Sequence, residues 1–231
     1  MADFLPTPTR TALINVDMQN CFVEGGPLAS PDGLAVVERV NQLAEACRRA
    51  GIFVVHTRGW MRPDGSNLGV MGEIVPPFIV GLYTEGSPTA ELHSSLQVEV
   101  GDIVVNKPRY GAFYSTDLEL ILRARGIDTV IVTGIATNIC CETTAREAAV
   151  RDFRVFFLSD GTATMDMNGV TALDLQRATC ASLGQVFAQV LPVATMIEKI
   201  EEAAPQAERS SEVPVTAYRP LAEAATGSPT R

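Results

Sequence analysis

The sequence predicts an α/β protein, a three-layer α/β/α sandwich with a mainly parallel sheet of six strands. Short runs of Val, Ile, Leu and Phe recur along the chain and are almost wholly apolar, as strands covered on both faces are. Segments with the spacing of amphipathic helices alternate with these runs, which favours parallel strands joined by helical crossovers. The chain has 231 residues, enough for one domain with a substantial core.

Each predicted strand is a short apolar run that ends at a polar residue, a glycine or a proline. The runs are TALINVD, IFVVHT, DIVVN, TVIVTG, FRVFFLSD and QVFAQV, at 11–17, 52–57, 102–106, 129–134, 153–160 and 185–190. Because the runs are separated by helical segments, they can pair side by side in one sheet.

Each predicted helix carries apolar residues at helical spacing, and some carry end signals. Gly51 and Gly126 are placed to stop two of them, and Ser115 or Thr116 is placed to cap the start of another. The expected helices are 34–50, 116–126, 138–151, 169–184 and 193–203.

Two segments depart from this alternation. Residues 58–98 are rich in Gly and Pro and too long for a plain connection, so they are expected to form a covering loop, either a lid or a subunit contact. Residues 204–231 are rich in Ala, Pro and Ser, typical of a disordered tail, with an arm on a neighbouring subunit as the alternative. The sequence thus predicts a single domain over 1–203.

Composition narrows the partners and the location. The formal net charge of −9 argues against nucleic acid or an anionic membrane as a partner, and leaves a small-molecule substrate. No apolar stretch has the length of a membrane span, and the N-terminus shows no secretory signal, so a cytoplasmic location is expected. The five cysteines are expected to be reduced thiols.

The ends of the predicted strands indicate where a site would lie, because parallel sheets bind ligands beyond the carboxyl ends of their strands. Asp17, Lys107 and the turn 134–140 all leave such ends. An acid and a lysine together can hold a thiolate and move its proton. The alternatives are a capping role for Asp17 and a solvated strand end for Lys107.

Two adjacent cysteines follow the fourth predicted strand. Cys140 falls in the first turn of the helix capped by Thr137 or Asn138, where unpaired N–H groups favour a thiolate. Cys141 shares a helix face with alanines at 145, 148 and 149, typical of packing, whereas Cys140 shares one with a threonine and a glutamate at 144 and 147. Cys140 is therefore the candidate nucleophile, unless both cysteines belong to the core.

Three ordered segments resemble one family, the isochorismatase-like cysteine hydrolases. They are VDMQN (16–20), NKPRYGAFYSTDLELIL (106–122) and GIATNICCETTAREA (134–148). The resemblance implies Cys140 as nucleophile, Asp17 as catalytic acid and base, and Lys107 as the lysine beside them.

The same resemblance implies further features. It implies a cis peptide bond at Ile135–Ala136 and an oxyanion hole made by the N–H groups of Ala136 and Cys140. The reaction would be hydrolysis of a C–N bond through a thioester, with no cofactor, in a homodimer or homotetramer. The segment HTRGWMRPDG (56–65) lacks the Asp-x-His metal site of nicotinamidases, so no metal is expected.

The nearest resemblance is to the branch that contains ureidoacrylate amidohydrolase, N-carbamoylsarcosine amidase and biuret hydrolase. It implies that Trp60 and Tyr110 line the substrate pocket with Phe113 nearby, and that Arg58 or Arg109 binds a carboxylate. The expected substrate is a small ureido, N-carbamoyl or amide compound. The alternatives are a nicotinamidase-like or other amide hydrolase, a non-catalytic binding subunit, or a redox thiol protein.

Overall fold

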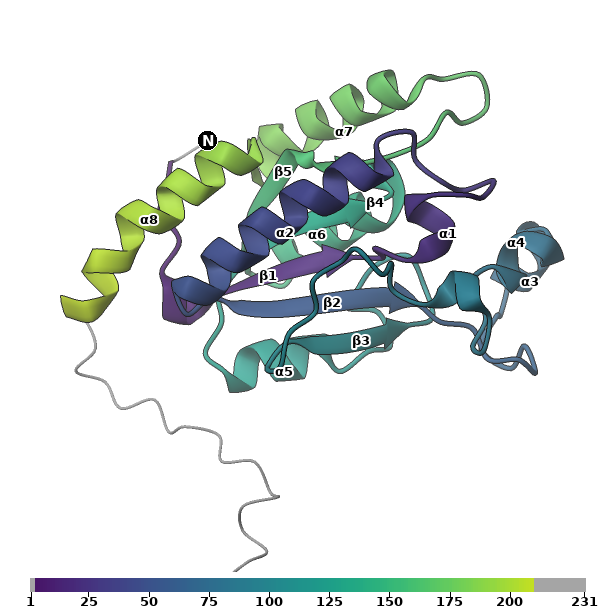
Figure 1. Ribbon diagram of the computed structural model, residues 1–231, viewed down its shortest axis with the longest axis horizontal. Helices are drawn as coiled ribbons and strands as arrows, with labels where there is room; N and C mark the ends of the chain where they lie inside the picture. Colours follow the sequence, from purple (N-terminus) through teal and green to yellow (C-terminus); the bar gives the residue numbers. More distant parts are fainter. Residues whose placement is uncertain (1–2, 210–231) are drawn as a thin grey trace, which may run out of the picture.

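The computed structural model describes residues 3–209, and its centre is a six-stranded sheet (Figure 1). The strand order is β3-β2-β1-β4-β5-β6, and every neighbouring pair is parallel. The strands are β1 (Thr11–Val16), β2 (Phe53–Gly59), β3 (Ile103–Lys107), β4 (Thr129–Ile135), β5 (Arg154–Ala163) and β6 (Gln189–Leu191). The predicted fold class is confirmed, and the sheet is wholly rather than mainly parallel.

Helices cover both faces of the sheet, which makes the three layers (Figure 1). Helices α2 and α8 pack on one face, and α5, α6 and α7 pack on the other. The long helices are α2 (Gly33–Arg49), α5 (Leu118–Ala124), α6 (Glu142–Ala149), α7 (Ala172–Val186) and α8 (Val193–Arg209). The short ones are α1 (Asn20–Val23), α3 (Met71–Ile74) and α4 (Pro77–Gly81), with 3₁₀ turns η1 (Pro8–Arg10) and η2 (Pro88–Ala90), and a π-helical turn η3 (Thr137–Cys141).

The core is divided in two by the sheet, because successive side chains of a strand point to opposite faces. Leu13 and Ile131 face α2 and α8, whereas Ile14 and Val132 face α5, α6 and α7. All four side chains are fully buried. Burial on both faces explains why the strands are apolar without alternation.

Several boundaries differ from the predicted ones, among them three near the C-terminal end of the domain. Helix α7 continues through Gly184 to Val186, so β6 is a strand of three residues rather than the six predicted at 185–190. Helix α8 continues to Arg209, past the predicted domain end at residue 203. The rest of the predicted tail, 210–231, lies outside the described residues.

The segment 58–98 lies over the carboxyl ends of the strands and contains α3, α4 and η2 (Figure 1). It has a small apolar core of its own, formed by Met61, Met71, Val80 and Tyr83. Its predicted role as a covering loop agrees with this position, and its movement as a lid stays a prediction.

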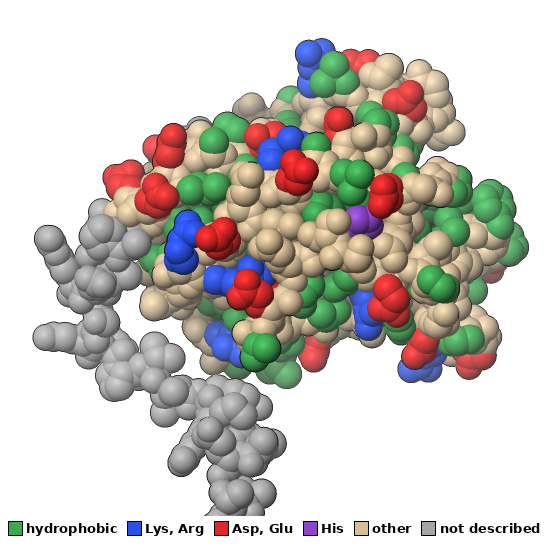
Figure 2. Space-filling model, in the orientation of Figure 1, with side chains coloured by type: hydrophobic (Ala, Val, Ile, Leu, Met, Phe, Trp, Pro, Cys, Tyr) green, Lys and Arg blue, Asp and Glu red, His purple; other side chains and the backbone are tan. Residues whose placement is uncertain are grey.

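The surface carries mixed charges, with acidic and basic side chains interspersed over the face in Figure 2. Apolar side chains gather at the end of the molecule over α3 and α4, where Val70, Ile74 and Phe78 are each more than half exposed. Within residues 3–209, none of the helices has the length and apolar character needed to cross a membrane.

The strand order brings β1 and β4 together at the centre of the sheet. The chain winds outward from β1 to β3, then returns to place β4 on the other side of β1, and such a reversal opens a crevice at the carboxyl ends. Gly134 sits at this crossing with φ +119°, and a Cβ atom there would lie 2.0 Å from the carbonyl oxygen of Val16. Only glycine lets the two strands approach so closely.

Candidate active site

Asp17 and Lys107 form a buried ion pair at the carboxyl ends of the strands. Asp17 follows β1 directly, with φ +52°, and Lys107 is the last residue of β3. The Lys107 Nζ lies 2.7 Å from Asp17 Oδ2, and both side chains are 1% exposed. Thr57 of β2, the strand between them, donates its hydroxyl to Asp17 Oδ1 at 2.9 Å. Three neighbouring strands therefore fix the carboxylate in one orientation.

The Lys107 ammonium group is held charged despite its burial. Its Nζ donates to the carbonyl oxygens of Arg109 and Tyr110, each at 2.9 Å, in addition to pairing with Asp17. Burial opposes the charge, but the attraction of Asp17 and of Cys140 outweighs it and raises the pKa of Lys107. The site therefore contains a fixed positive charge beside the candidate nucleophile.

Cys140 lies in the turn η3 and lines the same cavity as Asp17 and Lys107. Its side chain is nearly buried, with 9% exposure. Burial raises the pKa of Cys140 to about 12; the Lys107 charge opposes this rise, and Asp17 adds to it. The position at a helix start was expected to favour a thiolate, but desolvation outweighs that effect. Near neutral pH the thiol is protonated, so an attack by sulfur needs a base.

Cys141 faces away from the cavity into the core. Its side chain is fully buried with Ala145 and Ala148, and its Sγ donates to the carbonyl oxygen of Thr133 at 3.6 Å. Burial raises its pKa well above the usual range. The predicted division of the two cysteines, one at the site and one in packing, agrees with this arrangement.

Thr144 and Glu147, the polar residues on the Cys140 side of α6, hold the segment that follows β3. Thr144 donates its hydroxyl to the Cys140 carbonyl oxygen at 2.7 Å and accepts from the Ala112 N–H at 3.1 Å. Glu147 Oε2 accepts from the Phe113 N–H at 3.0 Å. Helix α6 thereby fixes the chain that supplies the carbonyl partners of Lys107.

The backbone before the nucleophile turns sharply. The peptide bond between Ile135 and Ala136 is cis in the structure. The N–H groups of Ile139 and Cys141 both donate to the Ala136 carbonyl oxygen, at 3.2 and 3.1 Å. Ala136 and Cys140 both line the cavity.

The cavity has a volume of about 240 Å³. Asp17, Lys107 and Cys140 line one part of it, and most of the remaining wall is apolar. The apolar wall consists of Phe22, Leu28, Met61, Met71, Val75, Ile79, Tyr83, Ile139, Met165 and Met167. A small molecule in it would meet one polar reactive patch and an otherwise hydrophobic surface.

Two of the predicted substrate-binding residues lie outside this cavity. Arg58 stacks on the ring of Trp60, with its guanidinium carbon 3.9 Å from the ring centroid. It also donates to Asn106 Oδ1 at 2.7 Å and pairs with Glu91 at 2.5 Å. Arg58 is thus engaged by Trp60, Asn106 and Glu91. Trp60 does not line the cavity as predicted, and a carboxylate contact from Arg58 would have to form outside it.

Of the remaining three predicted substrate-binding residues, two line the cavity and one does not. Phe113 is 5% exposed and packs on Phe153 in the core, with ring centroids 5.6 Å apart, so it is a packing residue rather than a pocket residue. Tyr110 lines the cavity, and so does Arg109, whose predicted contact with a carboxylate stays a prediction. Arg109 is the one charged residue of the lining besides Asp17 and Lys107.

Sequence reasoning missed several supporting residues. Gln19 donates to the carbonyl oxygens of Gly59 and Ala90, at 3.1 and 2.6 Å, and accepts from the Gly59 N–H at 2.8 Å. It therefore ties the 58–98 segment to the end of β1. Its place two residues after Asp17, and that of Thr57 at the end of a strand, were signals that could have found both.

Neither of the two histidines lines the cavity. His56 is buried in the sheet, with its ring nitrogens 3.3 Å from Asn15 Nδ2 and 3.1 Å from Asp102 Oδ2, and burial lowers its pKa. His93 lies 2.9 Å from Glu24. A Cys–His pair is therefore not formed. Within residues 3–209, no group of three His, Cys, Asp or Glu side chains is arranged to hold a metal ion.

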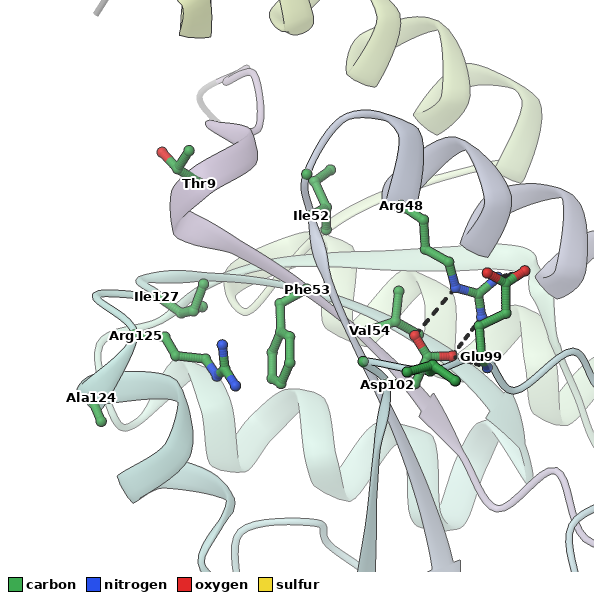
Figure 3. A pocket seen from close by; sticks show the side chains of 13 residues that line it. Thr9, Arg48, Ile52, Phe53, Val54, Glu99, Asp102, Ala124, Arg125 and Ile127 are labelled. Carbon is green, nitrogen blue, oxygen red and sulfur yellow. Dashed lines mark hydrogen bonds and ion pairs between the residues drawn. The ribbon is translucent and has the colours of Figure 1, made fainter. Parts of the chain in front are cut away.

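A larger hollow, of about 620 Å³, lies at the opposite ends of the strands, away from the Cys140 cavity (Figure 3). Its charged groups already have partners: Arg48 pairs with Asp102 at 2.6 Å and with Glu99 at 3.5 Å, and Arg125 stacks on Phe53. It contains no cysteine and lies at the amino ends of the strands. The smaller cavity is therefore the candidate site, because it alone of these two combines a nucleophile with an acid and a lysine.

The isochorismatase domain model matches residues 11–195 of the chain, which include all three of these residues. The chain belongs to the isochorismatase family. The family assignment predicted from the three motifs is thus confirmed.

Relatives of this isochorismatase-family chain include named amide hydrolases. A ureidoacrylate amidohydrolase RutB from Methylorubrum extorquens is 39% identical over 171 residues, which are 66% of this chain and 69% of the relative. Nicotinamidase 3 from Arabidopsis thaliana is 35% identical over 188 residues, 80% of this chain and 86% of the relative. A cysteine hydrolase structure from Pseudomonas syringae pv. phaseolicola has a TM-score of 0.83 at 36% identity, covering 88% of this chain and all of the other. The chain is therefore a hydrolase of amide-type C–N bonds.

Proposed function

We propose that the protein hydrolyses a small amide, ureido or N-carbamoyl compound through a thioester on Cys140. The strongest support is that Cys140 lines the same cavity as the Asp17–Lys107 ion pair. A buried thiol with a raised pKa is inert unless a base lies beside it, and Asp17 is that base.

The proposed reaction has two halves. Asp17 takes the proton of the Cys140 thiol, and the sulfur attacks the carbonyl carbon. The oxyanion that forms is stabilised by the N–H groups of Ala136 and Cys140. Asp17 then gives the proton to the departing nitrogen, and ammonia or an amine leaves a thioester. Water, deprotonated by Asp17, attacks the thioester, which releases the acid and restores the thiol.

Lys107 supports both halves by charge rather than by proton transfer. Its ammonium group stays protonated through the cycle, because its pKa is raised by Asp17 and Cys140. A fixed positive charge stabilises the thiolate as it forms and orients the Asp17 carboxylate. We expect the active form to be a homodimer or homotetramer, in line with the resemblance described above.

Ammonia release from a panel of ureido, N-carbamoyl and simple amide compounds tests this proposal. We expect at least one compound to release ammonia, and we expect iodoacetamide treatment to abolish the release once mass spectrometry shows Cys140 to be alkylated. Ammonia release that continues at full rate after Cys140 is alkylated would overturn the proposal. So would the absence of release from every compound of the panel.

A further inference from the structure

The wall of the active-site cavity has an unusual composition for a site that would hold a polar substrate. Four of its side chains are methionines, Met61, Met71, Met165 and Met167, and they come from two segments that lie far apart in the sequence. Thioether side chains are flexible and polarizable and adapt to apolar groups of varied shape. The wall therefore favours a hydrocarbon group over a hydrogen-bonding one.

Most of the charge around the cavity is already engaged by protein partners. Asp17 and Lys107 neutralise each other at 2.7 Å. Arg109 donates from Nη1 to the carbonyl oxygens of Pro108 and Asn67, at 2.6 and 2.8 Å. Its other terminal nitrogen packs on Gly69, where an added Cβ atom would lie only 2.7 Å away. The guanidinium group is thus anchored to the backbone through one of its terminal nitrogens.

The size of the cavity sets a second limit. Its volume of about 240 Å³ is below the range of about 300–1,000 Å³ typical of drug-sized ligands. The reacting amide must occupy the end lined by Cys140. What remains is room for a short substituent.

We propose that the substrate carries an uncharged apolar substituent, a short aliphatic or small aromatic group, that packs on the methionine-rich wall. This inference rests on the proposed function of the same site. A substrate that ends in a carboxylate would bury its charge against the apolar wall wherever that carboxylate lies out of reach of Arg109. A carboxylate held by Arg109 is therefore the competing outcome.

A series of primary amides tests the proposal: acetamide, butyramide and hexanamide, with succinamate as the charged partner of butyramide. We expect kcat/KM to rise about three- to fourfold for each added methylene until the cavity is full. We expect butyramide to exceed succinamate, in which a carboxylate replaces the terminal methyl group, at least tenfold. A preference for succinamate would overturn the inference while leaving the proposed function intact.

A matched pair of variants locates the selectivity in the wall. Val75 lines the cavity, whereas its neighbour Ile74 is 68% exposed. We expect Val75→Asp to lower kcat/KM for hexanamide at least tenfold with little effect on acetamide, and Ile74→Asp to change neither. Equal losses on both amides in Val75→Asp, with thermal stability kept, would contradict the role of the wall.

Binding separates a failure of the inference from a failure of the proposed function. Ligand-observed NMR with the Cys140→Ser variant measures hexanamide and succinamate binding without any turnover. If wild-type protein hydrolyses no amide but hexanamide binds more tightly than succinamate, the inference stands and the proposed reaction fails. If succinamate binds as tightly as hexanamide or more tightly, the inference is overturned whatever the activity.

Discussion

Replacing Cys140 with serine is expected to reduce amide hydrolysis at least about a thousandfold, as the loss of a catalytic nucleophile does. A serine hydroxyl is a far weaker acid than a thiol, and a carboxylate is too weak a base to remove its proton efficiently. The side chain is nearly buried and little larger than its replacement, so the fold should be kept. Ammonia release and thermal denaturation, measured side by side, check both statements.

Cys141→Ser is the matched control. Cys141 is fully buried on the opposite side of the turn, and a serine hydroxyl there can donate to the same Thr133 carbonyl oxygen. We expect activity to stay within a fewfold of wild type, with at most a modest loss of stability. If both variants lose activity alike, the assignment of Cys140 as the nucleophile fails.

Breaking the Asp17–Lys107 pair has the second large expected effect. Lys107→Met leaves the Asp17 carboxylate buried without its cation, and we expect a loss of about 3–5 kcal/mol of unfolding free energy. Asp17→Asn leaves the ammonium group unpaired, with a similar loss. Asparagine is the suitable replacement because Asp17 has a positive φ that asparagine tolerates. Each single variant should also lose hydrolysis at least about a hundredfold, since the base or its positive partner is gone.

The double variant Asp17→Asn/Lys107→Met separates stability from catalysis. With both charges removed, no buried charge is left unpaired, and we expect most of the stability lost in either single variant to return. Activity should not return, because the site has neither base nor fixed charge. Urea denaturation and ammonia release measure the two quantities. Strictly additive losses of stability would show that the two side chains do not form the coupled pair.

Sequence patterns predicted most of the sheet because buried parallel strands leave a strong signal. Five of the six predicted strands lie where β1 to β5 are, within a few residues. The sixth was placed too early because QVFAQV suits a strand or a helix end equally. Gly184, the last residue of the predicted helix, lies inside α7, which continues to Val186.

The three candidate residues could be located in part because the topology carries strand ends to one edge of the sheet, and the family resemblance then indicated their roles. Asp17 and Lys107 stand at such ends, and the helix period distinguished Cys140 from Cys141. Most of the apolar wall could not be predicted, because it comes from loops and short helices around residues 22–28, 61–83 and 165–167 that have no sustained periodic pattern. For the same reason, the aromatic residues at 60 and 113 gave no sign of which side of the chain they face.

Detection of the acyl-enzyme tests the central claim most directly. Cleavage after arginine releases residues 126–146 as one peptide that contains Cys140 and Cys141, so the Cys141→Ser variant leaves a single thiol in it. After a rapid acid quench during turnover of a hydrolysed amide, we expect this peptide to gain the mass of the acyl group at Cys140 and to lose it with hydroxylamine. Continued ammonia release with this peptide unmodified throughout would contradict the account.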